Sequence, residues 1–346
     1  MTGGAGAVCR RSQLPVKNLI LAGDIGGTKT NLAVFSAHGE KLRSESSRTF
    51  PSKQYSGLAP ILKEFLAGAN HAIEAACFGI AGPVVEGRVK TTNLPWIVDS
   101  NELRRTLKLD SVNLLNDLEA GAYGIFTLEE EEFFTLNEGE LRDAGNKALI
   151  AAGTGLGQAI LYDDGRRFRP LATEGGHADF GPRDELEIAL LRHLIGRFGH
   201  VSYERVLSGP GLFNIYRFLK DAQGMAEPPI LSERLGAAED ASAVISKAAL
   251  AGEFEICVKT LDLFVSLYGA EAGNLALRAK SLRGLYVGGG IAPKILDGLK
   301  GGRFMRAFSD KGRYAGLLEA IPVQVVLNEQ AALRGAAYYA ALLSGD

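Results

Sequence analysis

Two residues that follow a predicted strand have the chemistry of a general base and its neighbour. The strand is expected at 112–115, and Asn116 and Asp117 come directly after it. In open α/β sheets, ligands bind where strands end and helices begin. An aspartate there can accept the proton of an attacking hydroxyl, and the asparagine amide can hydrogen-bond a second hydroxyl. The pair also fits an ordinary helix N-cap, so both interpretations stay open at this point.

A second polar segment, Glu174–Phe180, has the composition of a sugar-binding loop. Two glycines leave its backbone exposed and close to any ligand. A carboxylate accepts hydrogen bonds from vicinal sugar hydroxyls, and neutral His177 can donate to one hydroxyl and accept from another. The alternatives are a metal site with Asp179 as third ligand and a plain polar loop. Further along, Glu204 gains a role only if it faces the same pocket as Glu174.

The glycine-rich stretch Gly23–Thr30 predicts phosphate binding within a β-hairpin. The apolar run Leu19–Ala22 precedes it and Asn31–Phe35 follows it, which indicates strand, turn and strand. Glycine N–H groups can approach a phosphate closely, and Asp24 supplies an oxygen ligand of the kind that Mg²⁺ prefers. The spacing matches neither a Walker loop nor a dinucleotide fingerprint. Lys29 receives no role, and an ordinary glycine-rich hairpin is the alternative.

The same plan of strand, glycine turn and strand recurs at 147–162, where the turn is Gly153–Gly157. The repetition favours two related phosphate loops over two unrelated hairpins. Gly288–Gly290 ends another strand at a helix start, which suits the ribose or α-phosphate of a nucleotide; close strand–helix packing is the alternative. A kinase needs a phosphate cradle with Mg²⁺, a group that positions the hydroxyl, and closure against water.

Strands that alternate with helices predict an α/β fold around these motifs. Strands are expected at 18–35 (a hairpin), 75–80, 112–115, 147–162 (a hairpin), 284–288 and 323–327. Helices are expected at 56–69, 101–107, 118–125, 184–198, 240–280, 294–299 and 329–343. A chain of 346 residues is expected to form two domains, since single cores stop growing near ~250–300 residues.

The composition excludes several classes of protein. A net charge of −2 and a pI near 6.3 leave no electrostatic footprint for nucleic acid or an anionic membrane. No run of ~18 apolar residues predicts a membrane span. The three cysteines are scattered, which argues against a disulfide framework or a cysteine zinc site and favours the cytoplasm. Residues 1–17 lack a signal-length apolar core and are expected to form a flexible extension.

Assembled in order, these motifs make the chain resemble the bacterial glucokinases, from about residue 19 to residue 342. These sugar kinases share the duplicated, ribonuclease H-like fold of actin, hexokinase and Hsp70. The resemblance rests on seven segments: Gly23–Thr30, Gly79–Pro83, Leu115–Asp117, Gly153–Gly157, Glu174–Phe180, Glu204–Leu212 and Tyr286–Pro293. It implies an actin-like fold with two lobes and an interdomain cleft, and a homodimer. It also implies ATP- and Mg²⁺-dependent phosphorylation of the glucose 6-hydroxyl.

The resemblance also implies a role for each candidate residue. Asp117 would be the catalytic base, and the sugar would be bound by Asn116, Asp117, Glu174, His177 and Glu204. The nucleotide would be bound by a first phosphate loop (Gly23, Asp24, Ile25, Gly26, Gly27 and Thr28), a second phosphate loop (Gly153, Thr154 and Gly155) and an adenosine segment (Gly288, Gly289 and Gly290). Asp24 would contact Mg²⁺ through water. The smaller domain would be 18–117 and the larger 118–346, and the closing helix could pack back on the smaller one.

The chain departs from the related repressor/kinase group in two ways, and two other functions remain as alternatives to glucokinase activity. The related repressor/kinase group has a cysteine-rich zinc motif after the histidine segment, and this chain has none, which favours a zinc-free branch. Residues 1–17 cannot supply the DNA-binding domain of the repressors. The chain could instead phosphorylate another hexose, such as fructose or mannose. It could also be a non-catalytic sugar sensor, although a pure binder has no need of Asp24 together with Asp117.

Overall fold

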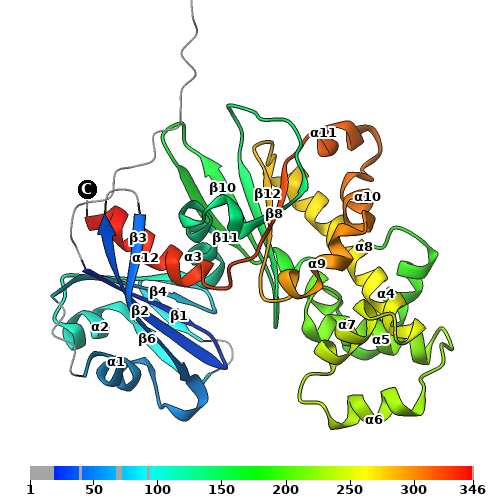
Figure 1. The fold of residues 1–346 in the computed structure, drawn as a ribbon, viewed down its shortest axis with the longest axis horizontal. Coiled ribbons are helices and arrows are strands. Elements are labelled where there is room, and N and C mark those ends of the chain that lie inside the picture. Colours follow the sequence, from blue (N-terminus) through cyan, green and yellow to red (C-terminus); the bar gives the residue numbers. More distant parts are fainter. Residues whose placement is uncertain (1–18, 39–40, 68–71, 92–93, 345–346) are drawn as a thin grey trace, which may run out of the picture. The chain divides into compact units, whose positions relative to one another are not determined.

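The computed structural model describes residues 19–38, 41–67, 72–91 and 94–344 (Figure 1). The extension expected at 1–17 lies outside these residues. The chain divides into two compact units. The first consists of Met1–Glu132, Asp164–Ala172 and Asn328–Asp346, and the second consists of Phe133–Asp163 and Thr173–Leu327. Within the described residues, no helix has the length and apolar character needed to cross a membrane.

The first unit is built on a five-stranded sheet with the order β3-β2-β1-β4-β7. Strands β1, β2 and β3 form an antiparallel meander, and β4 and β7 add to it in parallel. The strands are β1 (Leu19–Ile25), β2 (Lys29–His38), β3 (Lys41–Pro51), β4 (Ile73–Ile80) and β7 (Ser111–Asn116), with a separate ribbon of β5 (Arg88–Lys90) and β6 (Ile97–Asp99). The helices are α1 (Leu58–Leu66), α2 (Ser100–Leu107), α3 (Asp117–Gly124) and α12 (Ala331–Ser344).

The alternation of side chains along β1 assigns Asp24 to one face of this sheet. Leu21 and Ile25 belong to the apolar cluster that contains the buried residues of α1 and α2. Ile20 and Ala22 belong to the cluster on the opposite face, together with residues of α3 and α12. In Figure 1, α12 and α1 lie on opposite sides of this sheet. Because successive side chains of a strand point to opposite faces, Asp24 shares the face of α3 and α12.

The second sheet has six strands in the order β11-β10-β9-β12-β13-β8. Strands β9 and β10 form an antiparallel hairpin, and β12 and β13 continue from β9 in parallel. This repeats the plan of the first sheet and confirms the predicted duplicated α/β fold. The strands are β8 (Phe133–Asn137), β9 (Lys147–Ala152), β10 (Leu156–Asp163), β11 (Phe168–Thr173), β12 (Leu285–Gly288) and β13 (Val323–Val326).

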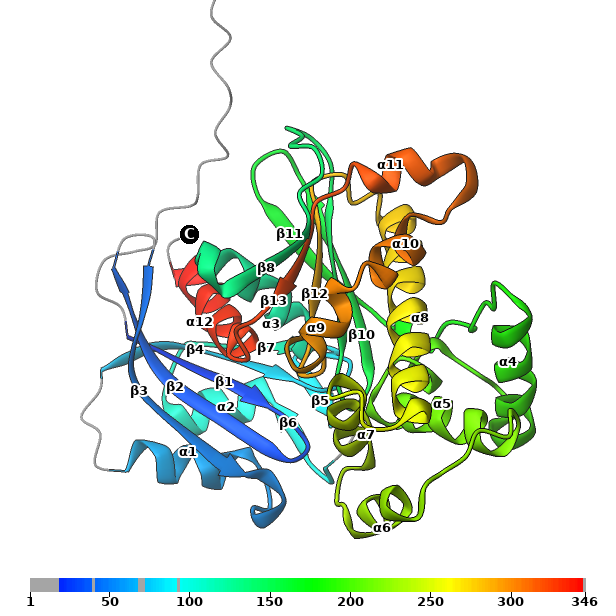
Figure 2. The ribbon, with the colours of Figure 1, turned by 45° about the vertical axis from the view of Figure 1, so that its right-hand side comes forward.

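The 25-residue helix α8 (Glu255–Ala279) is the centre of the second unit's core. It contacts α5, α7 and α10 and is buried along most of its length (Figure 2). The helical stretch expected at 240–280 is therefore two helices, because α7 ends at Leu250 and Gly252 adopts a φ of +67°. The other helices are α4 (Glu185–Phe198), α5 (Gly209–Asp221), α6 (Pro229–Ala237), α7 (Ala241–Leu250), α9 (Leu296–Lys300), α10 (Arg303–Ser309) and α11 (Ala315–Glu319).

Candidate active site

The predicted first phosphate loop connects β1 to β2, and a buried serine fixes its shape. Within the loop, the Gly26 N–H donates to the Lys29 carbonyl at 2.9 Å. Ser52 follows β3, and its hydroxyl donates to the Gly26 carbonyl at 2.8 Å. The Ser52 N–H donates to the Thr28 carbonyl at 3.0 Å. The loop is therefore held from outside, by a residue that no local sequence motif reveals.

Asp24 lies near the end of β1, opposite Asn31 of β2 and beside Gly79 of β4. The Asn31 amide donates to its carboxylate at 3.3 Å. Burial raises the pKa of Asp24 to about 6; the Asn31 hydrogen bond opposes this rise, and the negative charge of Asp117 adds to it. Two neighbouring negative charges attract a cation, so Asp24 and Asp117 together favour cation binding.

This pair of carboxylates fits the magnesium ion of a nucleotide. Mg²⁺ keeps several waters and is bound through one or two carboxylates together with substrate phosphates, so it needs no cage of protein ligands. Across the described ranges, no group of three or more His, Cys, Asp or Glu side chains is arranged to hold a metal ion. Asp24, the predicted contact to Mg²⁺ through water, is compatible with an ion that is held mainly by water and substrate phosphates.

We expect Asp24→Asn to stabilise the nucleotide-free protein by about 1–2 kcal/mol near pH 7.5, since the amide avoids burying a charge. The folded-state pKa of Asp24 is raised from 3.8 to about 6, so ionisation of the carboxylate opposes folding above about pH 6. The gain should shrink as the pH falls from about 6 toward 3.8, because wild-type Asp24 then takes up a proton. Chemical denaturation at both ends of this range measures it, and a gain that does not change with pH would refute the assignment.

Asn116 ends β7 and caps α3, and Asp117 is the first residue of that helix. The Asn116 side-chain oxygen accepts from the Leu118 N–H at 2.9 Å, and its amide donates to the Gly82 carbonyl at 3.1 Å. One carboxylate oxygen of Asp117 accepts from the same N–H at 2.9 Å. The N-cap interpretation is thus correct for Asn116. Asp117 lies in the first turn of α3.

Gly79 allows α3 to start close to the ends of β4 and β7. It pairs with Leu115 of β7, and a Cβ atom at Gly79 would lie 2.8 Å from the Cβ of Ala120. Contacts of that length do not occur between real side chains, so a larger residue would push α3 away from the sheet. Gly79 belongs to one of the motifs that carry the family resemblance. Its close contact with Ala120 explains why a glycine is needed at this position.

The two predicted sugar-binding segments of the second unit lie side by side. Glu174 precedes a short 3₁₀ turn that ends at His177; both side chains are exposed, with 3.9 Å between His177 Nε2 and Glu174 Oε2. The following residues pair with 201–203, where the Tyr203 N–H donates to the Ala178 carbonyl at 3.0 Å. Glu204 comes next in the chain, so backbone hydrogen bonds tie its segment to that of Glu174 and His177.

Asp179, the possible third metal ligand, has a different partner. Its carboxylate lies 2.7 Å from Nε2 of His200, and both of these side chains are exposed. Asp179 is therefore paired with His200 and not with His177, the histidine of its own segment.

Glu204 contacts the predicted second phosphate loop directly. Its carboxylate accepts from the Leu156 N–H at 3.0 Å, and a Cβ atom at Gly155 would lie 2.5 Å from the same oxygen. The loop is also held at its other end, because the Gly209 N–H donates to the Gly153 carbonyl at 2.8 Å. The sequence predicted a sugar contact for Glu204 and gave no sign of this link to the loop.

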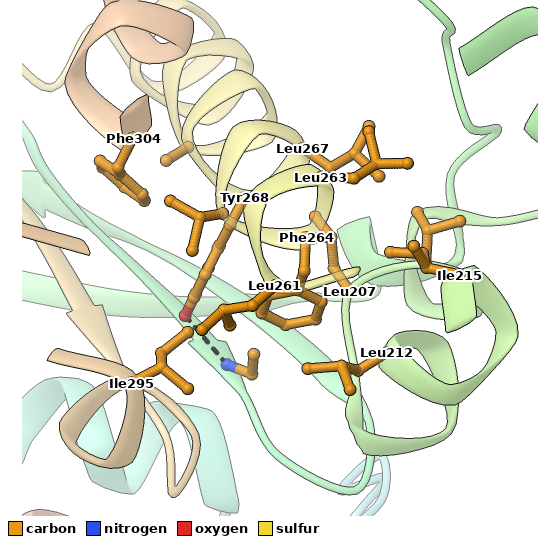
Figure 3. Close-up of a cluster of buried hydrophobic side chains, with 14 of the residues drawn as sticks. Leu207, Leu212, Ile215, Leu261, Leu263, Phe264, Leu267, Tyr268, Ile295 and Phe304 are labelled. Carbon is orange, nitrogen blue, oxygen red and sulfur yellow. Dashed lines mark hydrogen bonds between the residues drawn. The ribbon is translucent and has the colours of Figure 1, made fainter. Parts of the chain in front are cut away.

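A buried tyrosine joins the second phosphate loop to the predicted adenosine segment. The hydroxyl of Tyr268, on α8, accepts from the Ala152 N–H at 3.2 Å, the bond drawn in Figure 3. The same hydroxyl lies 3.2 Å from the Gly288 carbonyl, to which it donates. Ala152 precedes Gly153, so Tyr268 holds the ends of β9 and β12 together. Burial raises the pKa of Tyr268, which keeps the hydroxyl protonated.

The candidate residues fall into two sets, one in each unit. The first unit holds the first phosphate loop with Asp24, Asn116 and Asp117. The second unit holds the remaining sites, which are Glu174, His177, Glu204, the second phosphate loop and Gly288–Gly290.

Comparisons with known proteins agree over nearly the whole chain. The family model described as Glucokinase matches residues 21–343. A glucokinase of Trichormus variabilis is 44% identical over 341 residues, which cover 94% of this chain and 99% of that protein. The crystal structure of a glucokinase from an Antarctic psychrotroph has a TM-score of 0.82 and 32% identity, covering 93% of this chain and 98% of that one. A ROK family glucokinase from Streptomyces griseus, in complex with glucose and AMPPNP, shares the fold with a TM-score of 0.65 and 23% identity, over 93% and 99% of the chains.

Proposed function

The chain belongs to the glucokinase family, and on that premise we propose that it transfers a phosphoryl group from ATP to the 6-hydroxyl of D-glucose. The product is glucose 6-phosphate. The full-length match to the family and to curated glucokinases supports this activity. The Streptomyces griseus relative, whose structure contains glucose and AMPPNP, supports the choice of both substrates.

The observation that best favours a kinase over a sugar sensor is that Asp24 and Asp117 lie beside the same residue, Gly79. Asp24 pairs with Gly79 in the sheet, and the Cα of Asp117 would lie 3.8 Å from a Cβ at Gly79. Asp24 would face the magnesium ion, and Asp117 would accept the proton of the 6-hydroxyl. A sensor that only binds sugar gains nothing from two mutually repelling carboxylates. In a phosphotransferase the same arrangement places a base next to the ion that neutralises the phosphates.

The remaining candidate residues would bind and orient the substrates. Asn116, Glu174, His177 and Glu204 would hydrogen-bond the sugar hydroxyls and fix the direction of the 6-hydroxyl. The glycines of the loops and of the adenosine segment would bring backbone N–H groups close to the nucleotide. When bound, Mg²⁺ would neutralise charge on the phosphates. Positioning and electrostatics supply most of the catalysis in phosphoryl transfer.

We expect Glu174→Gln to raise the KM for glucose by about 10–100-fold, since a charged hydrogen-bond acceptor contributes about 1.5–3 kcal/mol. The KM for ATP should change by less than about threefold, because the lost contact is to the sugar. Asp179→Asn is the matched control: it removes an exposed carboxylate from the same segment, one that is paired with His200. Steady-state kinetics test both variants, and an unchanged glucose KM in Glu174→Gln would exclude Glu174 from the sugar site.

A coupled assay with ATP, Mg²⁺ and a panel of hexoses tests the proposed activity. Glucose should be turned over with a kcat/KM well above those of mannose and fructose. Equal efficiency on glucose and mannose would contradict glucose specificity, and no turnover of any hexose would contradict the kinase itself.

We further propose that the enzyme is a cytoplasmic homodimer that supplies glucose 6-phosphate to glycolysis. The family resemblance supports each of these assignments. Light scattering coupled to gel filtration measures the oligomeric state, and a mass near the 36.8 kDa of one chain would contradict the dimer.

A further inference from the structure

Glu271, on α8, is a fully buried carboxylate that accepts hydrogen bonds from several side chains. Its exposed fraction is 0%. It accepts from the Gln158 amide at 2.7 Å, from the Asn274 amide at 2.9 Å and from the Arg278 guanidinium. A buried carboxylate is costly unless such donors satisfy it, and apolar residues of similar volume often serve stability as well or better. Stability alone therefore does not explain why a carboxylate is buried at position 271.

The first of these partners leads to the segment that carries Glu174 and His177. Gln158 is buried in β10, and its side chain lies so close to Gly175 that a Cβ there would be 2.9 Å from the Gln158 Cδ. The Thr173 hydroxyl donates to the Gln158 carbonyl at 3.1 Å and accepts from the Gly175 N–H at 3.2 Å. Gln158 thus holds Gly175 by its side chain and through Thr173.

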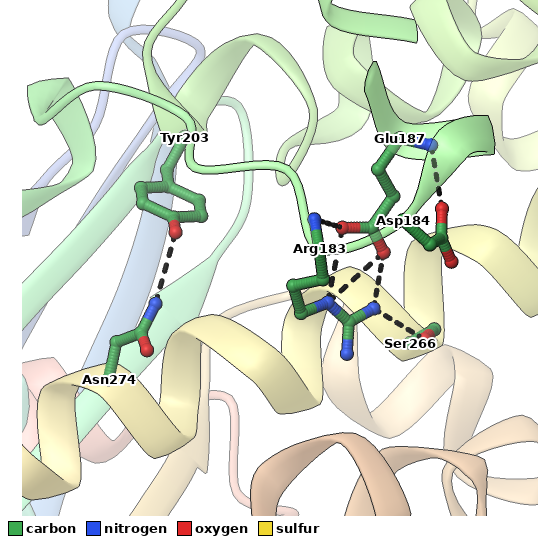
Figure 4. Close-up of polar contacts among 6 residues, drawn as sticks. All are labelled: Arg183, Asp184, Glu187, Tyr203, Ser266 and Asn274. Atoms are coloured by element: carbon green, nitrogen blue, oxygen red, sulfur yellow. Dashed lines mark hydrogen bonds and ion pairs between the residues drawn. The ribbon is translucent and has the colours of Figure 1, made fainter. Parts of the chain in front are cut away.

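The second partner leads to the segment that carries Glu204. Asn274 donates both to Glu271 and to the Tyr203 hydroxyl, the latter at 3.0 Å (Figure 4). Burial and the charge of Glu271 raise the pKa of Tyr203 to about 12. Tyr203 is the residue before Glu204, and its backbone N–H pairs with Ala178. One carboxylate is therefore connected to both candidate sugar segments.

We infer that Glu271 is a positioning residue for glucose: it orients Gln158 and Asn274, and these hold the segments of Glu174, His177 and Glu204 in their binding geometry. The inference rests on the proposed function, because it assumes that those segments bind the sugar. Glu271 itself does not contact the substrate. It affects glucose binding by fixing the orientation of the segments that contact the sugar.

Glu187 is a matched control within the same unit. Its side chain is 1% exposed, and it pairs with Arg183, which donates to Ser266 of α8 at 2.8 Å (Figure 4). Glu187 also accepts from the Arg183 N–H at 2.8 Å. It is thus a buried glutamate paired with an arginine and linked to the same helix, but its contacts do not lead to Gly175 or Tyr203.

The test compares Glu271→Gln with Glu187→Gln in the full-length protein. The new amide of Glu271→Gln turns a donor toward at least one neighbour that also donates, so the network must rearrange. We expect the glucose KM to rise about tenfold, with the ATP KM within about twofold of wild type, since only sugar-side groups are displaced. Glu187→Gln should lose thermal stability and keep its glucose KM within about twofold.

If Glu271→Gln does not fold, Gln158→Ala tests the same inference. This variant leaves Glu271 paired with Asn274 and Arg278 and keeps the backbone link from Gln158 through Thr173 to Gly175. It removes the Gln158 amide from Glu271 and the side-chain contact with Gly175, so it too should raise the glucose KM. An unchanged glucose KM in the variants that fold, or an equal rise in Glu187→Gln, would overturn the inference. Failure of the proposed function would look different, because the wild-type protein itself would not phosphorylate glucose.

Discussion

Replacing Asp117 by Asn is expected to lower kcat by about 10²–10⁴-fold while the protein stays folded. The substitution removes the proposed proton acceptor and keeps the shape and the hydrogen bond to the Leu118 N–H. Because the base acts in the transition state, the loss should appear in kcat and in kcat/KM, with a much smaller change in the glucose KM. Steady-state kinetics at saturating ATP measure the effect, and thermal unfolding confirms that the fold is retained.

Asp99→Asn controls for the loss of a carboxylate at a helix start. Asp99 is the N-cap of α2 in the same unit and accepts from the Asn101 N–H at 2.8 Å. We expect it to lower stability by about 1 kcal/mol or less and to leave kcat within about twofold of wild type. If Asp117→Asn retained a near wild-type kcat, Asp117 would not be the base, whatever its position.

Substituting Gly289 by Ala is expected to destabilise the protein by about 3 kcal/mol or more. Gly289 has a φ of +81°, which L-residues with a Cβ rarely adopt. A Cβ there would overlap the backbone of Ala152, with 2.8 Å to its nitrogen. The strand ends that Tyr268 holds together would have to separate, so ATP binding should weaken as well. Denaturant unfolding and the ATP KM are the measurements.

Gly290→Ala is the matched control on the adjacent residue. No atom lies within 4 Å of a Cβ built at Gly290. The expected loss of stability is less than about 1 kcal/mol. Equal destabilisation by the two substitutions would show that the positive φ and the close contact with Ala152 are not the reasons why Gly289 is needed.

The sequence predicted the parts of the fold in which local pattern and burial coincide. Both glycine hairpins, the strands that precede Asp117 and Gly289, and the closing helix have apolar runs bounded by glycine or by capping residues. Strand β3 was not predicted, because most of its side chains are exposed and it has no apolar alternation. The break between α7 and α8 was not predicted either, because apolar residues continue on both sides of Gly252.

The residues that support the candidate site were harder to predict, for a physical reason. Ser52 reaches the first phosphate loop, Tyr268 reaches the end of β9, and Glu271 reaches Gln158 of β10, each from another element. These contacts depend on the fold and on no local spacing. Helix α8 is buried along most of its length, so its pattern does not distinguish Glu271 or Tyr268 from residues that only fill the core. The roles assigned to residues that touch substrate stay predictions from the motifs.

Identification of the phosphorylated product by NMR tests the proposed glucokinase activity directly. The protein is incubated with ATP, Mg²⁺ and ¹³C-labelled glucose, and the carbon that couples to phosphorus is assigned. We expect glucose 6-phosphate, with phosphorus coupled to C6 and one ADP formed per product molecule. Phosphate on another hydroxyl, or ATP consumed with no phosphorylated sugar, would contradict it.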